Sequence, residues 1–512
     1  MLNRRTALVF VSALLFPAAL VSSAQSSNES LGQFTAAQDI GTVLHAGSTH
    51  FDAAKGTYTI NGSGDNTWST SDDLQFVWKK VEGDISLSAQ IDFANGGGNP
   101  HKKAMLMIRQ SLDPDSAYVD VARHGNGLTS LQYRNATSDV TREIELNVSG
   151  PQKVRIAKRG DYFYVWYAGA DGKWLYSGAS MKLSMQGAVY VGLGVCSHDK
   201  DVIETAAFSQ VHLAVSQTGT DAGADATAHG TLYSTLEVVP IASTDRRVVY
   251  VAAAHFEAPN WLRDNSGFLV NEGDRLERIG AKGEAAVLID TGGLNKINND
   301  HVLSPDGTRV AISDNTEPGG SRIYTLPIAG GQPQKLTANA PSYAHGWSPD
   351  GKTIAFCGER NGEFDVYTIP AAGGEETRLT TAKGLDDGPN YSPDGKYIYF
   401  NSERTGHMQI WRMLADGSQQ EHVIHETTND WFAHISPDGK WMVILAYGPE
   451  VTGHPPGQDV TLQLMSLADG KISLLAKLFG GQGTINVPSW SPDSTQVAFV
   501  SYAFVPDVSG GE

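Results

Sequence analysis

Histidine and acidic side chains recur at one kind of position in the C-terminal half of the sequence, just before a repeated Ser-Pro-Asp-Gly tetrapeptide. The tetrapeptide is nearly constant from copy to copy, whereas the segments that lead into it differ. An imidazole near neutral pH can bind a divalent metal or transfer a proton, with a carboxylate as its acid or base partner. The candidate ligand-binding residues are His255, Glu257, Asp300, His301, His345, Asp387, Trp431, His434 and His454.

Three roles for these side chains stay open. The candidates for catalysis are His301, His345, Asp300 and Glu257, and the candidates for a divalent metal are His301, His345 and His454. In the third interpretation they only hydrogen-bond water and neighbouring loops. No other cofactor is predicted, because the sequence has no phosphate-binding glycine loop, cysteine zinc motif or nucleotide fingerprint. The serines before Pro-Asp-Gly are turn residues, since no Gly-x-Ser-x-Gly nucleophile motif is present.

The repeat that carries these segments predicts a β-propeller. The six equivalent positions are Leu262, Ser304, Ser348, Ser392, Ser436 and Ser491, with spacings of 42, 44, 44, 44 and 55 residues. A period of about 40–45 residues with several short strands per unit is typical of propeller blades. The last copy has room for only two strands, and residues 239–252 resemble the missing pair. The sequence therefore predicts six blades, with N-terminal strands closing the ring and removing its free edges.

The tetrapeptides and the variable segments belong to opposite faces of this predicted ring. Pro-Asp-Gly is a tight turn between the first two strands of each blade. The residues before the first strand then lie on the other face and point toward the central channel. The long spacing of 55 adds a loop around residues 447–458 on that face, which contributes Glu450 and His454.

The N-terminal half reads as a second all-β domain. Short alternating segments rich in β-branched and aromatic residues are separated by Gly, Asp and Asn turns over residues 25–215, which predicts a β-sandwich. Residues 216–230 are small and polar and predict a linker to the propeller at 231–512. The predicted fold class is all-β: a jelly-roll sandwich followed by a six-bladed propeller.

Two family resemblances rest on particular motifs. Gly62–Trp68, Lys103–Arg109 and Tyr190–His198 resemble concanavalin-like, laminin-G-like jelly rolls, which implies an accessory glycan-binding role. The repeats over residues 235–505 resemble the TolB-like, WD40-type propeller family. The resemblance does not extend to TolB itself, because the α/β domain that precedes the TolB propeller is replaced by the predicted jelly roll.

The N-terminal residues predict where the protein is located, and the net charge of the chain excludes one class of partner. Residues 1–24 combine Arg4 and Arg5, an apolar run and a small-residue cleavage site, which predicts a secretory signal and a periplasmic or extracellular protein. No later stretch has the length of an integral membrane segment. The formal charge of −18 and the lack of a basic cluster exclude nucleic acid as an expected partner.

These observations favour an exported protein that binds a carbohydrate or cell-envelope polymer through the channel mouth and the lectin-like domain. Envelope proteins are further candidate partners. One alternative is a carbohydrate-active lyase or hydrolase with its histidine-lined site at the channel. Another is a Tol–Pal-type component of envelope or biopolymer transport. The sequence leaves open whether the protein is an enzyme, and it does not determine the oligomeric state.

Overall fold

The computed structural model describes residues 30–216 and 230–507. The predicted signal sequence and nearly all of the predicted linker lie outside these residues, so both stay predictions. Every regular element in the described ranges is a β-strand, which confirms the all-β class. None of the described residues forms a helix that could span a membrane.

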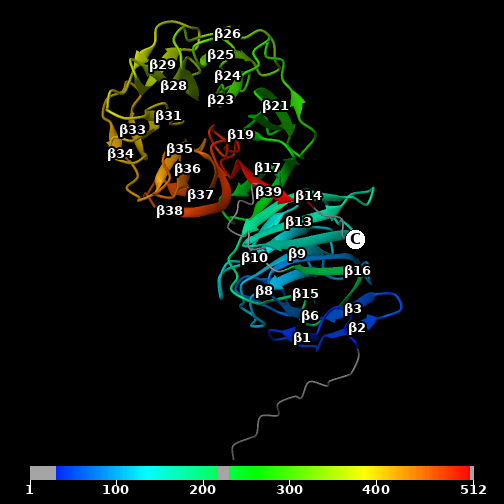
Figure 1. Ribbon diagram of the computed structural model, residues 1–512. Helices are drawn as coiled ribbons and strands as arrows, with labels where there is room; N and C mark the ends of the chain where they lie inside the picture. The colour runs from blue at the N-terminus through cyan, green and yellow to red at the C-terminus, as the bar shows by residue number, and fades with distance from the viewer. Residues whose placement is uncertain (1–29, 217–229, 508–512) are drawn as a thin grey trace, which may run out of the picture.

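Two large sheets share one hydrophobic core in the N-terminal part of the molecule (Figure 1). The ten-stranded sheet has the order β1 (Ala36–Ile40), β6 (Leu74–Val81), β15 (Val189–Cys196), β8 (Lys103–Arg109), β9 (Tyr118–His124), β10 (Thr129–Arg134), β11 (Arg142–Glu145), β18 (Arg246–Ala252), β17 (Gly230–Pro240) and β39 (Gln496–Pro506). The seven-stranded sheet has the order β14 (Trp174–Lys182), β13 (Tyr162–Ala168), β12 (Lys153–Arg159), β7 (Asp84–Phe93), β16 (Glu204–Ser216), β3 (Thr57–Gly62) and β2 (Ser48–Asp52). A short hairpin joins β4 (Thr67–Trp68) to β5 (Ser71–Asp72).

Apolar side chains at alternate positions of the strands form the core between these sheets. Leu106 and Ile108 of β8 face Leu87 of β7 and Ile156 of β12, and all four are buried. Side chains two positions apart lie on one face of a strand, so the apolar set of each sheet meets the other sheet.

Five four-stranded blades form the C-terminal ring. They are β19 (Phe256–Trp261), β20 (Gly267–Glu272), β21 (Arg275–Gly280) and β22 (Val287–Leu288); β23 (Ile297–Leu303), β24 (Arg309–Asp314), β25 (Arg322–Pro327) and β26 (Gln334–Lys335); β27 (Ser342–Trp347), β28 (Thr353–Arg360), β29 (Glu363–Pro370) and β30 (Thr377–Arg378); β31 (Asp386–Tyr391), β32 (Tyr397–Ser402), β33 (Gln409–Leu414) and β34 (Glu421–His422); and β35 (Asn429–Ile435), β36 (Trp441–Tyr447), β37 (Pro456–Ser466) and β38 (Ile472–Gly481).

The repeated tetrapeptide closes the turn between the first two strands of a blade. Ser304 Oγ donates a 2.6 Å hydrogen bond to Asp306 Oδ1 and accepts one of 3.0 Å from the N–H of Arg309. Gly307 ends the turn at a φ of +69°, a region that favours glycine. The equivalent serines make the same two bonds, which explains why the motif is constant.

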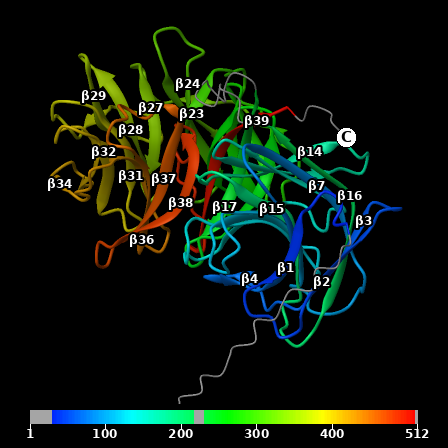
Figure 2. The same ribbon diagram turned by 60° about the horizontal axis from the view of Figure 1, so that its bottom comes forward.

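The prediction of six blades and a separate jelly roll is wrong. Within residues 30–216 and 230–507, only five sheets have four strands, and the strands expected to complete a sixth blade, β39, β17 and β18, belong to the ten-stranded sheet. Strand β18 pairs in parallel with β11, where Ile144 lies opposite Arg246. In both views, β17 and β39 lie between the ring of blades and the N-terminal sheets (Figures 1 and 2). A repeat pattern identifies strands by their local sequence, but it does not reveal which edge a distant strand will join.

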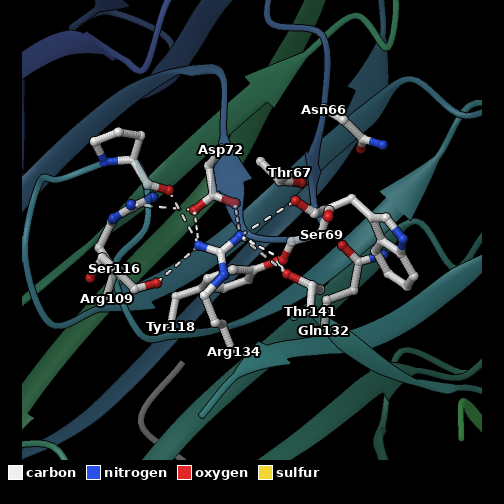
Figure 3. A network of polar contacts seen from close by, with 12 residues as sticks. Asn66, Thr67, Ser69, Asp72, Arg109, Ser116, Tyr118, Gln132, Arg134 and Thr141 are labelled. Carbon is white, nitrogen blue, oxygen red and sulfur yellow. Dashed lines mark hydrogen bonds and ion pairs between the residues drawn. The ribbon is translucent and has the colours of Figure 1, made fainter. Parts of the chain in front are cut away.

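A buried ion network joins the ten-stranded sheet to the hairpin of β4 and β5 (Figure 3). Arg134 donates to both carboxylate oxygens of Asp72 over 2.9 and 2.8 Å, and Arg109 Nη2 lies 3.3 Å from Asp72 Oδ2. All three side chains are fully buried. Arg134 also donates to the backbone carbonyls of Ser69 and Ser116, so one guanidinium holds two loops.

Asp72→Asn should destabilise the protein strongly. The change leaves two buried guanidinium groups without their counter-charge, and breaking a buried pair in this way costs about 3–5 kcal/mol of unfolding free energy. Urea unfolding followed by tryptophan fluorescence measures the loss. The matched control is Asp201→Asn, which removes an exposed carboxylate of the same part of the chain. Equal stability of the two variants would contradict the structural role of the network.

Candidate functional site

The innermost strand of each blade carries a bulge at an equivalent place. The register shifts between Glu257 and Asn260 in β19, Ile297 and His301 in β23, Ala344 and Gly346 in β27, Asp387 and Asn390 in β31, and Trp431 and His434 in β35. A bulge inserts an unpaired residue and re-aims the neighbouring side chains. The variable segments of the sequence repeat fall on these bulges, on the strands that line the centre of the ring.

Three side chains from successive blades meet at this centre. His345 of β27 has Nε2 3.1 Å from Asp387 Oδ1 of β31 and Nδ1 4.0 Å from Asp300 Oδ1 of β23. All three residues are buried. An imidazole therefore lies between two carboxyl groups, and each group comes from a different blade.

Polar contacts extend this triad around the ring. Asn298 Nδ2 donates to Asp300 Oδ2 over 2.7 Å, and Asn299 Nδ2 donates to Glu257 Oε2 over 3.0 Å. We call Glu257, Asn299, Asp300, His345, Asp387 and His454 the channel belt.

His454 reaches the belt from the loop between β36 and β37. Its ring centroid lies 4.3 Å from that of Trp431 and 5.3 Å from that of Phe432. Phe432 also stacks on His345 at 6.3 Å. Two aromatic rings therefore support the histidines of the belt.

The triad separates the pKa values of its carboxyl groups. Burial raises the pKa of Asp300 to about 6, a rise that the charge on Asp387 reinforces and His345 opposes. Burial also disfavours the charged form of Asp387, but the neighbouring His345 holds the pKa of that carboxyl well below its usual range. Burial disfavours the charged form of His345 as well, yet the two carboxylates raise the pKa of this histidine overall. Two carboxyl groups whose pKa values differ in this way can serve as an acid and a base.

Two other predicted histidines hold inner strands together. His301 Nδ1 donates to Asn260 Oδ1 over 3.1 Å, and His434 Nε2 donates to the carbonyl of Ile485 over 2.7 Å. Burial lowers the pKa of His301 to about 3 and that of His434 to about 4, so both are neutral at pH 7. Each neutral ring then has one free nitrogen as an acceptor, Nε2 in His301 and Nδ1 in His434.

The remaining predicted residues lie beside the belt. Trp431 is fully buried, whereas His255 is exposed and stacks on Tyr502 at 5.2 Å. Sequence analysis did not identify Tyr502 or Phe432. Tyr502 lies on the last strand, outside the segments that vary before each tetrapeptide, and no sequence signal links it to them. A Cβ at Gly483 would overlap both the Tyr502 hydroxyl and Glu257, so only glycine fits there.

Several buried polar atoms at the belt have no hydrogen-bond partner. They are Nδ1 of His345 and His454, Nε2 of His301, Nδ1 of His434, Nε1 of Trp431 and the hydroxyl of Tyr502. Buried polar atoms are nearly always paired, so a concentration of unpaired donors and acceptors indicates contact with water or a ligand.

The metal site suggested for His301, His345 and His454 does not fit this geometry. Within residues 30–216 and 230–507, no three His, Cys, Asp or Glu side chains are arranged to hold a metal ion. His301 instead bonds to Asn260, on the neighbouring inner strand β19.

Asp430→Asn should stabilise the protein at alkaline pH. Burial raises the pKa of Asp430 to about 7, and the Thr428 hydroxyl partly offsets this through a 2.8 Å bond. The folded state therefore keeps a proton that the unfolded chain loses near pH 4. Stability falls as the pH rises from about 4 to about 7, and the penalty is complete above that range.

Thermal melts at pH 4 and pH 8 measure this effect. The midpoint of Asp430→Asn should exceed that of the wild type by at least about 2 °C at pH 8, with the gap closing toward pH 4. Glu375→Gln, which removes an exposed acid, is the matched control. A gap of equal size at both pH values would show that the charge of Asp430 is not the cause.

Comparison with known proteins agrees with the repeat architecture. Residues 302–503 match the family model described as the TolB beta propeller domain. An uncharacterized protein of Agrobacterium fabrum is 47% identical over 274 residues, which cover 53% of this chain and 94% of the relative. A solved structure from Agrobacterium tumefaciens, named after TolB, is 47% identical and covers 54% of this chain and 99% of its own, with a TM-score of 0.52. The similarity extends over nearly the whole length of both relatives, and the chain therefore belongs to the TolB β-propeller family.

Proposed function

We propose that this protein binds a carbohydrate or another hydroxyl-rich polymer of the cell envelope through the channel belt. The observation that carries the proposal is the set of buried, unpaired donors and acceptors that the second, third and fifth blades and strand β39 bring to the belt. A sugar hydroxyl both donates and accepts, so it can pair with the free nitrogen of a neutral imidazole and equally with an indole N–H.

The rings beside the belt suit the same class of ligand. Phe432 and Trp431 present apolar surface next to His454 and His345, and a pyranose combines an apolar face with a polar edge. The predicted signal sequence would place the protein where envelope polymers occur. Envelope proteins would be further partners.

His345→Gln should weaken binding of the full-length protein to its polymer by about tenfold or more. The substitution keeps a polar side chain of similar length but removes the charge held between Asp300 and Asp387. Co-sedimentation with purified peptidoglycan and with insoluble cell-wall polysaccharides measures the binding. His425→Ala, which alters an exposed histidine of the fourth blade, is the control and should bind as the wild type does. Absence of binding to every polymer would refute the proposal.

Catalysis on such a polymer is the second candidate, and one observation favours it. Asp300 and Asp387 flank one imidazole and differ widely in pKa, as a general acid and a general base require. Asp300 would hold the proton to be donated, and His345 would position the charge of Asp387.

An enzyme of this kind should lose turnover as the pH rises through about 6, because Asp300 then loses its proton. Release of reducing ends or of unsaturated products from the bound polysaccharide, followed from pH 4 to pH 9, tests this profile. Asp300→Asn should abolish turnover while binding persists. A polymer that binds without any turnover would leave the protein as a binding module alone.

A further inference from the structure

A buried cation without a counter-charge lies on the outer face of the seven-stranded sheet. Val154 and Ile156 point into the core between the sheets, so Arg155 of β12 points the other way. Arg155 is only 7% exposed, and within residues 30–216 and 230–507 it makes no ion pair and no hydrogen bond. A guanidinium keeps its charge at physiological pH, and burying it unpaired is costly. Such a group is a candidate for binding an anion.

An indole holds this guanidinium and leaves its outer edge free. Arg155 Cζ lies over the half-buried ring of Trp174 of β14, 4.5 Å from the ring centroid. Trp174 pairs in register with Ala168 of β13, whose small side chain leaves room for the indole to reach across to β12. A cation over a ring is bound by its face, and the N–H groups of a guanidinium point outward in its plane. Nε is buried and unpaired, so Nη1 and Nη2 are the donors that a ligand can reach.

A bulge in β16 positions a second cation beside the first. The register of β16 against β7 shifts between Ser209 and His212, and Gln210 within the shift has a φ of +49°. Such strained positions are frequent at functional sites. Gln210 Oε1 accepts a 3.1 Å bond from Lys153 Nζ, which lies 5.3 Å from the Trp174 centroid. An amide therefore holds Lys153, and its charge is not neutralised.

No carboxylate of the described residues offsets the charge of Arg155. Burial lowers the pKa of Arg155, and the like charge of Arg159 on the same strand lowers it further. Asp92, on the outer face of β7, accepts a 3.0 Å bond from Gln90 Nε2, and its charge acts on Arg123. The face around Arg155 and Lys153 is therefore locally positive.

The charge of the whole chain limits which anion suits this face. The formal charge of −18 repels ligands with many negative charges. A single carboxylate meets mainly the local field, because salt screens charges beyond about 8–10 Å. A phosphate group carries about two negative charges, so a carboxylate fits better.

Neutral polar groups flank the guanidinium. Ser88 of β7 lies opposite Arg155, and His212 of β16 lies opposite Ser88. Residues paired in register share a face of the sheet, so a hydroxyl and an imidazole stand in one row with Arg155. Both can donate to or accept from a ligand hydroxyl. A carboxylate that carries hydroxyl groups next to it matches this row.

We propose that Arg155, Lys153 and Trp174 form a binding site for the carboxylate of a sugar acid of the uronic acid class. The carboxylate bonds end-on to Nη1 and Nη2 of Arg155, a pairing that guanidinium and carboxylate favour, and Lys153 adds a second positive charge. The site lies at the Trp174 end of β14, whereas Lys182 at the other end pairs with Asp459 of the fifth blade. It is separate from the channel belt and does not rest on the function proposed for the belt.

Isothermal titration of the full-length protein at low ionic strength with glucuronate, galacturonate, glucose and inorganic phosphate tests the proposal. At least one sugar acid should bind at millimolar concentration or below, and glucose should not. Arg155→Met should weaken this binding about tenfold or more, because it removes two charged hydrogen bonds. Arg155→Lys keeps the charge but loses the fork, so its affinity should lie between those of the wild type and Arg155→Met.

Thermal stability separates binding from a structural role of Arg155. Arg155→Met should melt at the temperature of the wild type or above it, because it removes an unpaired buried charge. A lower melting temperature with unchanged binding would assign Arg155 to packing alone and overturn the proposal. Lys153→Gln should weaken binding severalfold, and it decides the test if Arg155→Met fails to fold. Lys79→Gln, which alters an exposed lysine of β6 in the other sheet, is the matched control and should bind as the wild type does.

Four other results would overturn the proposal. Sugar-acid binding that survives both Arg155→Met and Lys153→Gln would place the ligand elsewhere. Loss of this binding in His345→Gln would assign the ligand to the channel belt. Equal binding of glucose, or binding of phosphate without either sugar acid, would show that a carboxylate is not what the site selects. Failure of both sugar acids to bind at millimolar concentration would leave the face without its ligand.

Discussion

The pairing of β17 with β39 is the interaction on which the rest of the structure depends. Gly230 to Pro240 lie opposite Pro506 to Gln496 along the whole length of both strands. This ladder joins the end of the chain to the first strand after the predicted linker, and β18 extends it to β11 of the N-terminal part. Strands β11, β18 and β17 thereby have partners on both sides, and β39 forms the edge of the sheet.

The channel belt depends on how the blades lie next to one another. Its triad takes one side chain from each of three successive blades, so it requires β23, β27 and β31 to pack side by side. No single blade holds the triad.

Burial gives the channel belt its electrostatic character. In water, Asp300 and Asp387 would titrate together, since they are chemically identical. In the ring both are desolvated, but His345 lies 3.1 Å from one and 4.0 Å from the other, and the charged form is stabilised mainly at the nearer carboxylate. His345, His454 and the N–H of Gly388 together stabilise the charged form of Asp387, whereas burial dominates at Asp300.

The sequence by itself determined the strands, the turns and the candidate residues on the inner strands of the ring. Ser304 with Asp306 and Gly307 illustrates this, since the bonds that close the turn lie within a few residues. The local pattern also identified Asp300, His345 and Asp387 as variable positions. Only the tertiary structure decided that these three meet while His301 and His434 bond to neighbouring inner strands. It also decided that the last strands join a ten-stranded sheet instead of a sixth blade. The physical reason is that turns and the alternation of apolar side chains depend on neighbours along the chain. Which strands pair and which side chains meet depends on segments far apart in the sequence and on the burial of their polar groups.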